Sequence, residues 1–480
     1  MAQRFRCTRP FRILSEGAVD EIHAATLRVL EEIGVRFADT KALVFLAAHG
    51  CQVDHERQVV RFPAGIVETC LERCPAEFRL RARNRDHDIV FDRNTVQFSA
   101  CSGMAVLDAE TGTRRPGTLK DAQEAAQLCD ALDVIAGSNT GLGHISDRPA
   151  EVNLEWLYAT AMRNSEKVTS VGVMDDSEKW GIRMAQAVGE DIIVVPSSSS
   201  PLGWSEDQLE GMRQALAADM PVGAQSMASP GMTAPATLAG TAVVMNAEIL
   251  AMLVLVQLMK PGTGFMVSCF AIPMDMRTTH LASGSIELGM LTAVSAQLSK
   301  RYGLGSIVFL PMSDSKVLDQ QAGFEKAMQW LLAGLSGINL IWGAGMVEGH
   351  GLWSNAQLVI DAEMCGMVGR CLQGIGVREE TLALDVIEQV GHFPNSYLGT
   401  DHTYEHWREE RYLPLVACRE AYEIWAELGR KDVVARAAEK ADHLLRDHEV
   451  VPLDEDVDRE LDRLLAAAAR EKGAPQPTEL

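Results

Sequence analysis

The sequence predicts an α/β protein, specifically a (β/α)8 TIM barrel with additions at both ends. Beyond residue 120, short apolar runs alternate with longer segments of helical pattern, eight against seven, which is the count of such a barrel. Several runs end in small or polar residues, as at 137–139, 197–200, 225–227, 312–316 and 343–345. Loops that follow the strands of a barrel carry its functional groups, so these are the candidate site segments. An open doubly wound sheet is the alternative, but no glycine-rich phosphate loop opens the first helix.

The barrel is predicted to occupy residues 121–400. Its predicted strands are residues 134–139, 168–173, 192–196, 221–226, 265–271, 306–311, 338–343 and 382–387. Its predicted helices are residues 151–163, 177–188, 205–219, 238–260, 284–302, 319–336 and 355–374.

Residues 1–120 predict an extension of helices and strands that precedes the barrel. A cap-like Ser15 opens a helix that Gly34 ends, a second helix covers 40–49, and a third covers 64–73 after Pro63. Residues 78–116 then alternate in the strand period, with a turn expected at 108–112. At the other end, residues 401–471 predict helices rich in Arg and Glu, and 472–480 predict a disordered tail.

Composition narrows the class of partner and the compartment. The 66 acidic residues outnumber the 44 basic ones, and a net charge of −22 repels nucleic acid and anionic membranes. The most apolar stretch, 249–259, is about half a membrane span and predicts a buried helix. The ten cysteines form no C-x-x-C pair, and no secretory signal is evident. We therefore expect reduced thiols and a cytoplasmic protein.

The usual catalytic motifs are absent. The sequence contains no H-E-x-x-H, G-x-S-x-G, P-loop or G-x-G-x-x-G motif. His402 and His406 stand four residues apart and can face one metal ion, but a salt-bridged surface turn is the favoured interpretation. No bound metal is expected.

Two polar segments follow predicted strands. In the segment 313–326, Asp314, Lys316 and Asp319 can form ion pairs with one another. One interpretation is that Asp319 is the N-cap of the following helix, and another is that the three residues form a charged cluster at the barrel mouth. The two interpretations are compatible. The segment 346–355 places Glu348, His350 and Trp353 among glycines. A site is favoured there over a flexible loop that ends in a helix cap.

Aromatic side chains are candidate walls for a cationic ligand. Phe98, Trp353, Trp342 and Trp204 are the candidates, with core packing as the alternative for each and the favoured one for Trp342. The Met-containing segments 227–235 and 274–278 follow strands and suit a docking surface.

A set of segments resembles a known family. They are residues 107–116, 233–240, 275–278, 313–316, 321–326 and 357–361. On these the chain resembles the trimethylamine methyltransferase family over nearly its whole length, and in particular members without pyrrolysine. The resemblance implies a TIM barrel that transfers a methyl group from an N-methyl amine to the Co(I) of a corrinoid (cobalamin) on a separate small protein.

The resemblance also implies a substrate class. Members with pyrrolysine demethylate trimethylamine, whereas this chain contains only standard residues. Members without it resemble quaternary-amine demethylases, with glycine betaine first and proline betaine, carnitine or butyrobetaine as alternatives. Such a reaction releases a neutral amine and needs no general acid, which agrees with the missing motifs.

Roles follow for individual residues. His350 is the predicted partner of a betaine carboxylate, Phe98 and Trp353 the predicted cage, and Trp342 a further substrate-binding residue. Glu348 and Asp314 add negative charge near the ammonium, and Asp314, Lys316 and Glu348 are the candidate catalytic residues.

Two other functions stay open. They are a metal-assisted lyase or hydrolase that uses His350, Glu348 and His402, and a betaine-binding protein without catalysis. A homo-oligomer is expected in each case.

Overall fold

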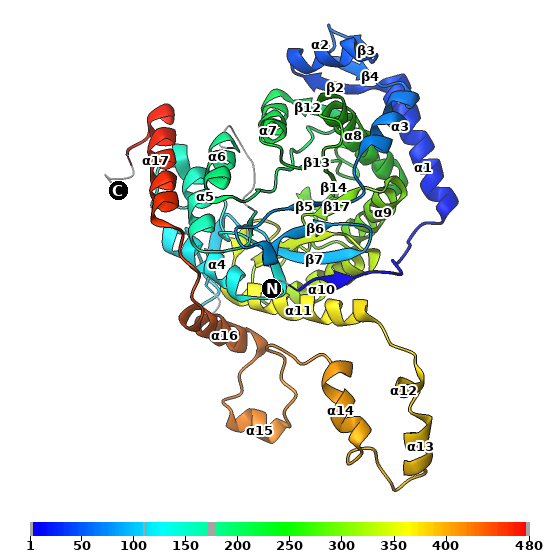
Figure 1. Cartoon of the computed structure of the whole chain (residues 1–480), viewed down its shortest axis with the longest axis vertical. Helices are drawn as coiled ribbons and strands as arrows, with labels where there is room; N and C mark the ends of the chain where they lie inside the picture. Colours follow the sequence, from blue (N-terminus) through cyan, green and yellow to red (C-terminus); the bar gives the residue numbers. More distant parts are fainter. Residues whose placement is uncertain (1–2, 109–110, 171–177, 477–480) are drawn as a thin grey trace.

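A curled, mainly parallel sheet forms the centre of the molecule. The computed structural model describes residues 3–108, 111–170 and 178–476 (Figure 1). The sheet order is β11-β10-β7-β18-β17-β14-β13, and β1, which is outside this path, pairs antiparallel with the start of β7. The strands are β1 (Phe5–Arg6), β7 (Thr95–Ala100), β10 (Ile135–Ser138), β11 (Val168–Thr169), β13 (Val222–Ser226), β14 (Phe265–Cys269), β17 (Gly305–Val308) and β18 (Leu340–Ala344).

The segment 192–197 lies between the two ends of this path. Isolated parallel bridges join Thr169 to Ile192 on one side and Val194 to Val222 on the other. The amide of Gly223 donates to the Val194 carbonyl at 2.8 Å. The segment is not a regular strand, because Pro196 has no N–H to donate to a ladder. The prediction of a strand at 192–196 therefore holds only as single bridges.

One predicted strand is wrong. Residues 382–387 fall in two short helices, α12 (Glu379–Leu382) and α13 (Leu384–Val390). Leu384, Ile387 and Val390 repeat every third residue, a helical spacing that a short apolar run hides. The sheet instead takes in β7, which lies before residue 120 and is buried throughout. The other predicted strands overlap β10, β11, β13, β14, β17 and β18, with 171–173 outside the described residues.

The seven predicted helices between the strands match the observed helices within two residues at every end. They are α5 (Asn153–Arg163), α6 (Glu178–Val188), α7 (Glu206–Ala217), α8 (Leu238–Met259), α9 (Ile286–Tyr302), α10 (Gln320–Ser336) and α11 (Asn355–Gln373), and α4 (Leu119–Ala131) precedes β10. Among the described helices, only α8 is long and apolar enough to cross a bilayer, and 78% of its apolar window is buried. It packs against helices of the N-terminal segment, as expected for a core helix.

The N-terminal segment covers one side of the sheet. It contains α1 (Glu16–Arg28), a π-helical turn (Val29–Ile33), β2 (Val35–Ala38), α2 (Thr40–Ala48), β3 (Gln52–Asp54), β4 (Val59–Arg61) and α3 (Ala64–Arg73). Ser15 caps α1 by accepting from the amide of Ala18 at 3.2 Å, and Gly34, at φ 85°, ends the helix as predicted. A strand from much later in the chain, β12 (Gly203–Ser205), extends this small sheet beside β2.

Short strands flank β7 along the chain. They are β5 (Phe78–Leu80), β6 (Ile89–Phe91), β8 (Ala105–Leu107) and β9 (Arg114–Arg115), which confirm the predicted strand-rich stretch. The predicted turn at 108–112 includes residues 109–110, which lie outside the described residues.

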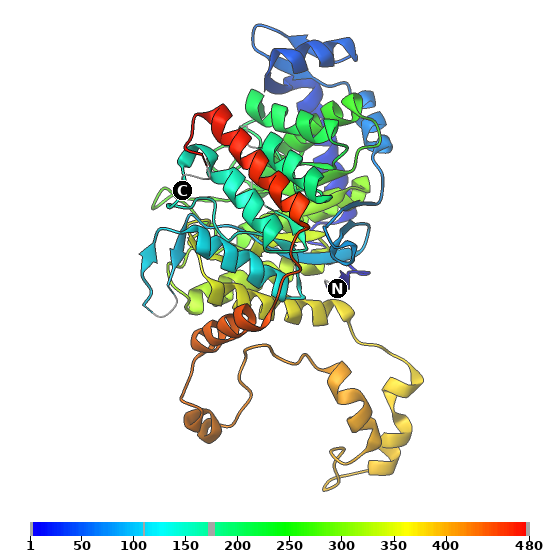
Figure 2. The same cartoon turned by 60° about the vertical axis from the view of Figure 1, so that its left-hand side comes forward.

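The C-terminal helices return to the body. Helix α16 (Val433–Asp447) packs on α11 and α4, and α17 (Glu455–Lys472) packs on α5 and α6. Arg163 pairs with Asp458 at 2.6 Å and Asp462 at 2.7 Å to hold α17 in place. Residues 374–432, here called the arm, leave the body between α11 and α16 and carry α12, α13, α14 (Asp401–Glu410) and α15 (Tyr422–Glu427) (Figure 2). The predicted divisions at 120, 400 and 472 stay predictions, and residues 477–480 lie outside the described residues.

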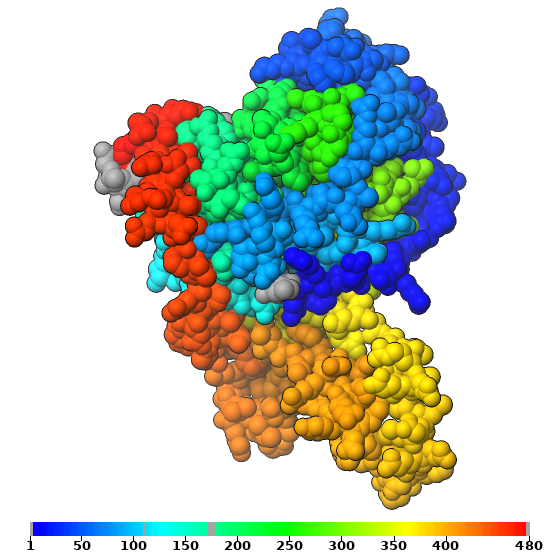
Figure 3. Space-filling view, in the orientation of Figure 1, coloured from blue at the N-terminus to red at the C-terminus, as the bar shows by residue number. Residues whose placement is uncertain are grey.

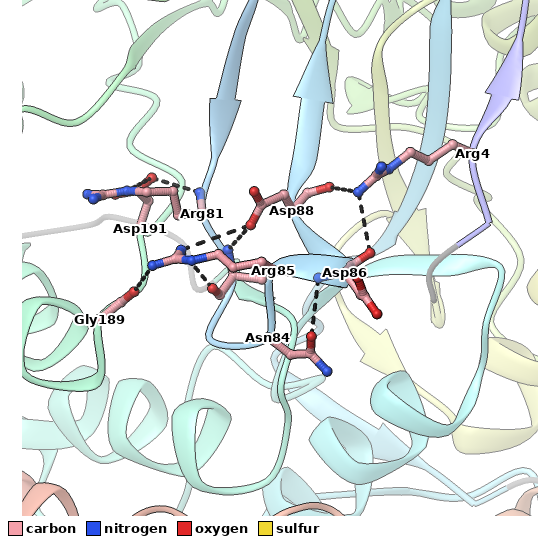
Figure 4. Close-up of polar contacts among 9 residues, drawn as sticks. Arg4, Arg81, Asn84, Arg85, Asp86, Asp88, Gly189 and Asp191 are labelled. Atoms are coloured by element: carbon pink, nitrogen blue, oxygen red, sulfur yellow. Dashed lines mark hydrogen bonds and ion pairs between the residues drawn. The ribbon is translucent and has the colours of Figure 1, made fainter.

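A polar network ties the chain together at the N-terminal ends of the strands (Figure 4). Arg81 makes a bidentate ion pair with Asp191, with its closest contact at 2.7 Å. Arg85 donates to the Gly189 carbonyl at 3.0 Å, and Arg4 donates to the Asp88 carbonyl at 2.8 Å. These contacts fix the start of the segment 192–197.

Glu190, which precedes Asp191 in the chain, should make the stability of the fold depend on pH. Burial raises the pKa of the Glu190 carboxyl to about 8. The folded chain therefore keeps a proton that the unfolded chain loses above about pH 4.5, so stability falls as pH rises from there to about 8. We expect Glu190→Gln to gain stability over the unmodified chain as pH rises, measured as urea midpoints at pH 5, 6.5 and 8. The exposed Glu206→Gln is the control, and a difference constant across pH would contradict the assignment.

Candidate active site

A cavity of about 300 Å³ opens at the C-terminal ends of the strands. Residues at the ends of β7, β10, β13, β14, β17 and β18, and of the segment 192–197, all reach it. The lining residues are Cys101, Ser102, Met104, Asn139, Leu142, Gly143, Leu154, Ile193, Val195, Ser197, Gln225, Phe270, Phe309, Trp342 and His350. This is the end of a parallel α/β sheet at which ligands usually bind.

Three aromatic side chains form one wall of the cavity. Phe270 and Phe309 each come directly after a strand, and their ring centroids lie 6.1 Å apart at 89°. Phe309 and Trp342 lie closer, at 4.2 Å and 37°. The Trp342 indole Nε1 is buried and finds no hydrogen-bond partner among residues 3–108, 111–170 and 178–476. Its ring therefore serves the wall rather than a polar network.

The polar side chains of the lining, such as Gln225, Ser197 and Asn139, carry no formal charge. Gln225 donates to the Ser197 hydroxyl at 3.3 Å and accepts from the Ser268 hydroxyl at 3.2 Å. Asn139 donates to the Ser170 carbonyl. No Asp, Glu, Lys or Arg lines the cavity within the described part of the chain. Such a lining suits a cation held by ring faces rather than by a carboxylate.

His350 also lines the cavity, close to Phe270. Its Nδ1 lies 3.2 Å from the Ser102 carbonyl, and its ring lies 5.4 Å from that of Phe270. The Cys101 thiol is 3.7 Å from the same Nδ1. Burial lowers the pKa of His350, so the neutral imidazole is favoured at pH 7.

The loop that carries His350 is anchored at both ends. Strands β19 (Met346–Val347) and β20 (Leu352–Trp353) pair antiparallel on either side of it, and β20 also pairs with β8. The Glu348 amide donates to the Ser315 carbonyl at 2.9 Å, and the Gly349 amide donates to the Ser313 carbonyl at 2.8 Å. The loops after β17 and β18 are thus joined into one rim.

The predicted charged residues hold this rim rather than line the cavity. Asp314 accepts from the amides of Ser283 and Gly284 at 2.9 Å each. Lys316 is exposed and donates to the Asp314 carbonyl at 2.5 Å. Asp319 caps α10, as predicted, and accepts from the Ser315 hydroxyl at 2.8 Å. Glu348 contributes its backbone amide to the rim, and its side chain is absent from the lining.

Of the four predicted aromatic residues, some lie in the protein core and one lines the cavity. Phe98 packs in the core against Phe5 and Trp330, with centroids at 5.8 and 5.4 Å. Trp353 is buried beside the cavity but outside its lining, and its Nε1 donates to Asn355 at 2.9 Å. Trp204 lies in β12 and donates to the Glu248 carbonyl at 3.2 Å. Trp342 alone of the four lines the cavity.

Sequence reasoning missed Phe270 and Phe309. Each is the first residue after a parallel strand, β14 or β17. That position was the available signal, because the first side chains after barrel strands are placed at the mouth.

His402 and His406 lie far from this cavity. They are in α14 on the arm, which stands apart from the body (Figure 1), and their ring centroids are 4.4 Å apart. The structure does not bring His402 to His350 and Glu348. Over the described residues, no three His, Cys, Asp or Glu side chains gather in a group suited to a metal ion.

Comparison with known proteins agrees with this architecture. The family model for trimethylamine methyltransferase matches residues 2–473. The chain belongs to this family. A trimethylamine methyltransferase of Desulfitobacterium hafniense is 34% identical and covers 91% of this chain and 90% of its own.

Other members of the family support the assignment. A glycine betaine methyltransferase of Desulfitobacterium hafniense is 31% identical over 96% of this chain and 98% of its own. The trimethylamine methyltransferase of Methanosarcina thermophila is 32% identical over 91% and 93%. The monomethylamine methyltransferase structure of Methanosarcina barkeri aligns with a TM-score of 0.52 at 12% identity, over 93% of this chain and 90% of that one. This last likeness shows the fold.

The segments 321–326 and 357–361, which resemble the trimethylamine methyltransferase family, meet at a buried ion pair. Lys326 and Asp361 form a completely buried ion pair at 2.9 Å. The Lys326 ammonium also donates to the carbonyls of Gly343 at 3.1 Å and Met346 at 2.7 Å. Asp361 accepts from the Gly345 amide at 2.8 Å. The pair therefore fixes the chain between Trp342 and the His350 loop.

Proposed function

We propose that this chain transfers a methyl group from a quaternary amine, glycine betaine first, to the Co(I) of a corrinoid held by a separate small protein. The observation that carries the proposal is the wall of Phe270, Phe309 and Trp342 in a cavity lined without charged side chains among the described residues. Aromatic faces attract a quaternary ammonium, and this attraction strengthens where water is excluded. Relatives that act on glycine betaine and on trimethylamine support it.

The proposal includes a closed barrel around this cavity. The segment 192–197 bridges both β11 and β13, which are the ends of the sheet path. With this segment counted as a strand position, the parallel path contains eight positions and closes on itself. All eight then direct their C-terminal ends at the cavity, as in a TIM barrel.

The proposed reaction requires the protein to orient the substrate, and it requires no general acid or general base. The C–N bond breaks with its electron pair left on nitrogen, the methyl group passes to cobalt, and a neutral amine leaves. The aromatic wall holds the ammonium, and the cavity orients one of its methyl groups for transfer. His350, at the rim, is the proposed partner of the betaine carboxylate. Asp314, Glu348 and Lys316 then act by shaping the rim.

The surface around the mouth supports a protein partner. Apolar side chains are exposed on the loops that follow four of the strands, with one pair on the hairpin β15 (Met274–Asp275) and β16 (His280–Leu281). They are Met104, Met232, Met276, Leu281 and Val317. Methionine-rich surfaces adapt to a partner, so this face is the proposed docking site of the corrinoid protein. All ten cysteines are free thiols, which supports a reducing, cytoplasmic setting for Co(I).

A spectroscopic assay tests the proposal. The purified chain is mixed with its corrinoid protein reduced to Co(I), and methyl-cobalt formation is followed with glycine betaine, proline betaine, carnitine, butyrobetaine and trimethylamine. Glycine betaine is expected to give the fastest methylation. A faster reaction with another betaine would change the substrate within the class, and no methylation from any of them would overturn the function.

His350 should make binding of a carboxylated substrate depend on pH. With Nδ1 donating to the Ser102 carbonyl, neutral His350 presents an unprotonated Nε2, whereas the imidazolium donates from both nitrogens. Because burial lowers the pKa of the free imidazole, binding a carboxylate must take up a proton. We expect KM for glycine betaine to rise by up to about tenfold per pH unit between the pKa of free and of bound His350.

Variants isolate this effect. His350→Gln should raise KM for glycine betaine at pH 6 and remove its pH dependence. Binding of tetramethylammonium, which has no carboxylate, should change much less. An equal loss for both ligands, or an unchanged pH profile in the variant, would contradict the role of His350.

A further inference from the structure

A second cavity, of about 420 Å³, lies at the opposite end of the strands from the candidate active site. Its walls come from residues 8–20, from the turn between β6 and β7, and from the last turns of α9 and α10. Figure 3 shows the dark blue N-terminal residues on the surface of the body, beside the light blue segment that precedes β7. The Cys7 amide donates to the Asn94 carbonyl at 2.8 Å and joins these two segments. This cavity is here called the basal pocket.

The basal pocket is positively charged, although the whole chain has a net charge of −22. Four cationic and two acidic side chains line it. Arg12 pairs with Glu16, and Arg301 pairs with Asp20 at 2.8 Å, so both acidic groups already have a cationic partner. The other two cationic side chains of the pocket therefore stay without a carboxylate from its walls.

These two cations are Arg93 and Lys300, and neither forms an ion pair within the described part of the chain. The Lys300 ammonium donates to the Arg93 carbonyl at 3.0 Å, so both residues belong to the same end of the pocket. Burial lowers the pKa of Lys300, and the charge of Arg93 also lowers it. Asp92 is already paired with Arg6 at 3.4 Å and accepts from the Asn94 amide at 2.8 Å. An anion bound between Arg93 and Lys300 relieves their repulsion.

The hydroxyl of Ser336 adds a donor to this pocket. Ser336 lines it with 1% of its surface exposed, and its buried Oγ has no hydrogen-bond partner among residues 3–108, 111–170 and 178–476. A buried hydroxyl without a partner is destabilising, and an acceptor on a bound molecule satisfies it. The helix dipole explains Lys300 and Arg301 in the last turn of α9, but it explains neither Arg93, which lies in a turn, nor this hydroxyl.

An arginine, a lysine and a hydroxyl together match a phosphate group. A phosphate offers three acceptor oxygens whereas a carboxylate offers two, and the arginine fork binds phosphate through two parallel hydrogen bonds. One phosphate fills only part of the 420 Å³, which is a volume typical of small-molecule sites. Phe11 also lines the pocket and exposes 43% of its surface, so its ring can stack on an aromatic base.

We propose that the basal pocket binds a nucleotide, with a phosphate group held by Arg93, Lys300 and Ser336 and with the base stacked on Phe11. The inference is independent of the proposed methyl transfer, because the two cavities share no lining residue. A nucleotide bound here leaves the mouth of the active-site cavity open.

Isothermal titration calorimetry on the full chain tests the proposal, with AMP, ATP, adenosine and inorganic phosphate as probes. AMP and ATP are expected to bind saturably, and about tenfold or more tightly than phosphate or adenosine, since each of these two offers only part of the recognition. Added salt should weaken AMP binding, because salt screens the charges. No saturable binding of AMP or ATP, or binding of phosphate as tight as that of AMP, would overturn the proposal.

Variants place the nucleotide in the basal pocket. Arg93→Gln, which removes an exposed charge, should weaken AMP binding about tenfold, and Phe11→Ser should weaken AMP binding while binding of phosphate stays unchanged. The control Arg28→Gln removes an equally exposed arginine of α1 outside the pocket and should bind AMP as the unmodified chain does. An unchanged AMP affinity in Arg93→Gln would contradict the proposal.

Hydrogen exchange on the unmodified chain gives a readout that needs no substitution. Saturating AMP should slow amide exchange in residues 8–20 and in the turn between β6 and β7, and it should leave the loop 346–355 unchanged. Slower exchange in 346–355 alone would move the nucleotide to the active-site cavity and exclude the basal pocket as its site.

Discussion

Replacing Trp342 with leucine is expected to raise KM for glycine betaine about 30-fold. Leucine keeps an apolar surface in the wall but has no π face, and a desolvated cation–π contact contributes about 2 kcal/mol. Because the indole Nε1 has no hydrogen-bond partner among the described residues, the change breaks no polar contact there. The measurement is the initial rate of corrinoid methylation as a function of betaine concentration.

Two controls separate charge recognition from simple loss of volume. Trp342→Phe retains a ring and should raise KM only a fewfold. The anion 3,3-dimethylbutanoate has the shape of glycine betaine with carbon in place of the charged nitrogen, and its inhibition constant should change little in Trp342→Leu. If the inhibitor and the substrate weaken together, the wall acts through shape and the cation–π assignment is wrong.

Lys326→Met is expected to cost the fold about 3–5 kcal/mol, because it leaves Asp361 as an unpaired charge in the core. Both side chains are completely buried, and burial raises the pKa of the Asp361 carboxyl. The same ammonium binds the carbonyls of Gly343 and Met346, so methyl transfer should fall as well. The measurement is the midpoint of urea unfolding.

A double variant tests whether the two residues act as a pair. Lys326→Met with Asp361→Asn removes both charges and keeps an acceptor for the Gly345 amide, so it should be more stable than the sum of the single changes predicts. Lys120→Met breaks the exposed pair with Glu124 and should cost less than about 1 kcal/mol. Additive effects of the buried pair would contradict coupling between them.

The helices were largely predictable because their ends carry local signals. Pro63 and Pro75 bound α3, and its predicted range of 64–73 is the observed one. The strands were less predictable, because pairing with neighbouring strands decides which short apolar runs join a sheet. Residues 382–387 and β7 look equally strand-like alone, but only β7 finds β10 and β18 beside it.

The sequence indicated which loops form the candidate site, but it did not indicate which aromatic side chains line the cavity. The loop after β18 was predicted to lie at the mouth, and its residue His350 lines the cavity. Phe98 and Trp353 belong to strands, where register decides which face a residue takes, and a shift of one residue reverses it. Their burial in the core depends on partners such as Phe5, which lies far away in the chain.

The aromatic wall also has a consequence for turnover. In the proposed reaction, ring faces attract the substrate through its positive charge, and methyl transfer removes that charge from nitrogen. The cation–π part of the attraction is therefore lost at the moment of reaction, whereas the proposed contact of His350 with the carboxylate remains. The loss of charge on nitrogen thus favours release of the product amine from the wall.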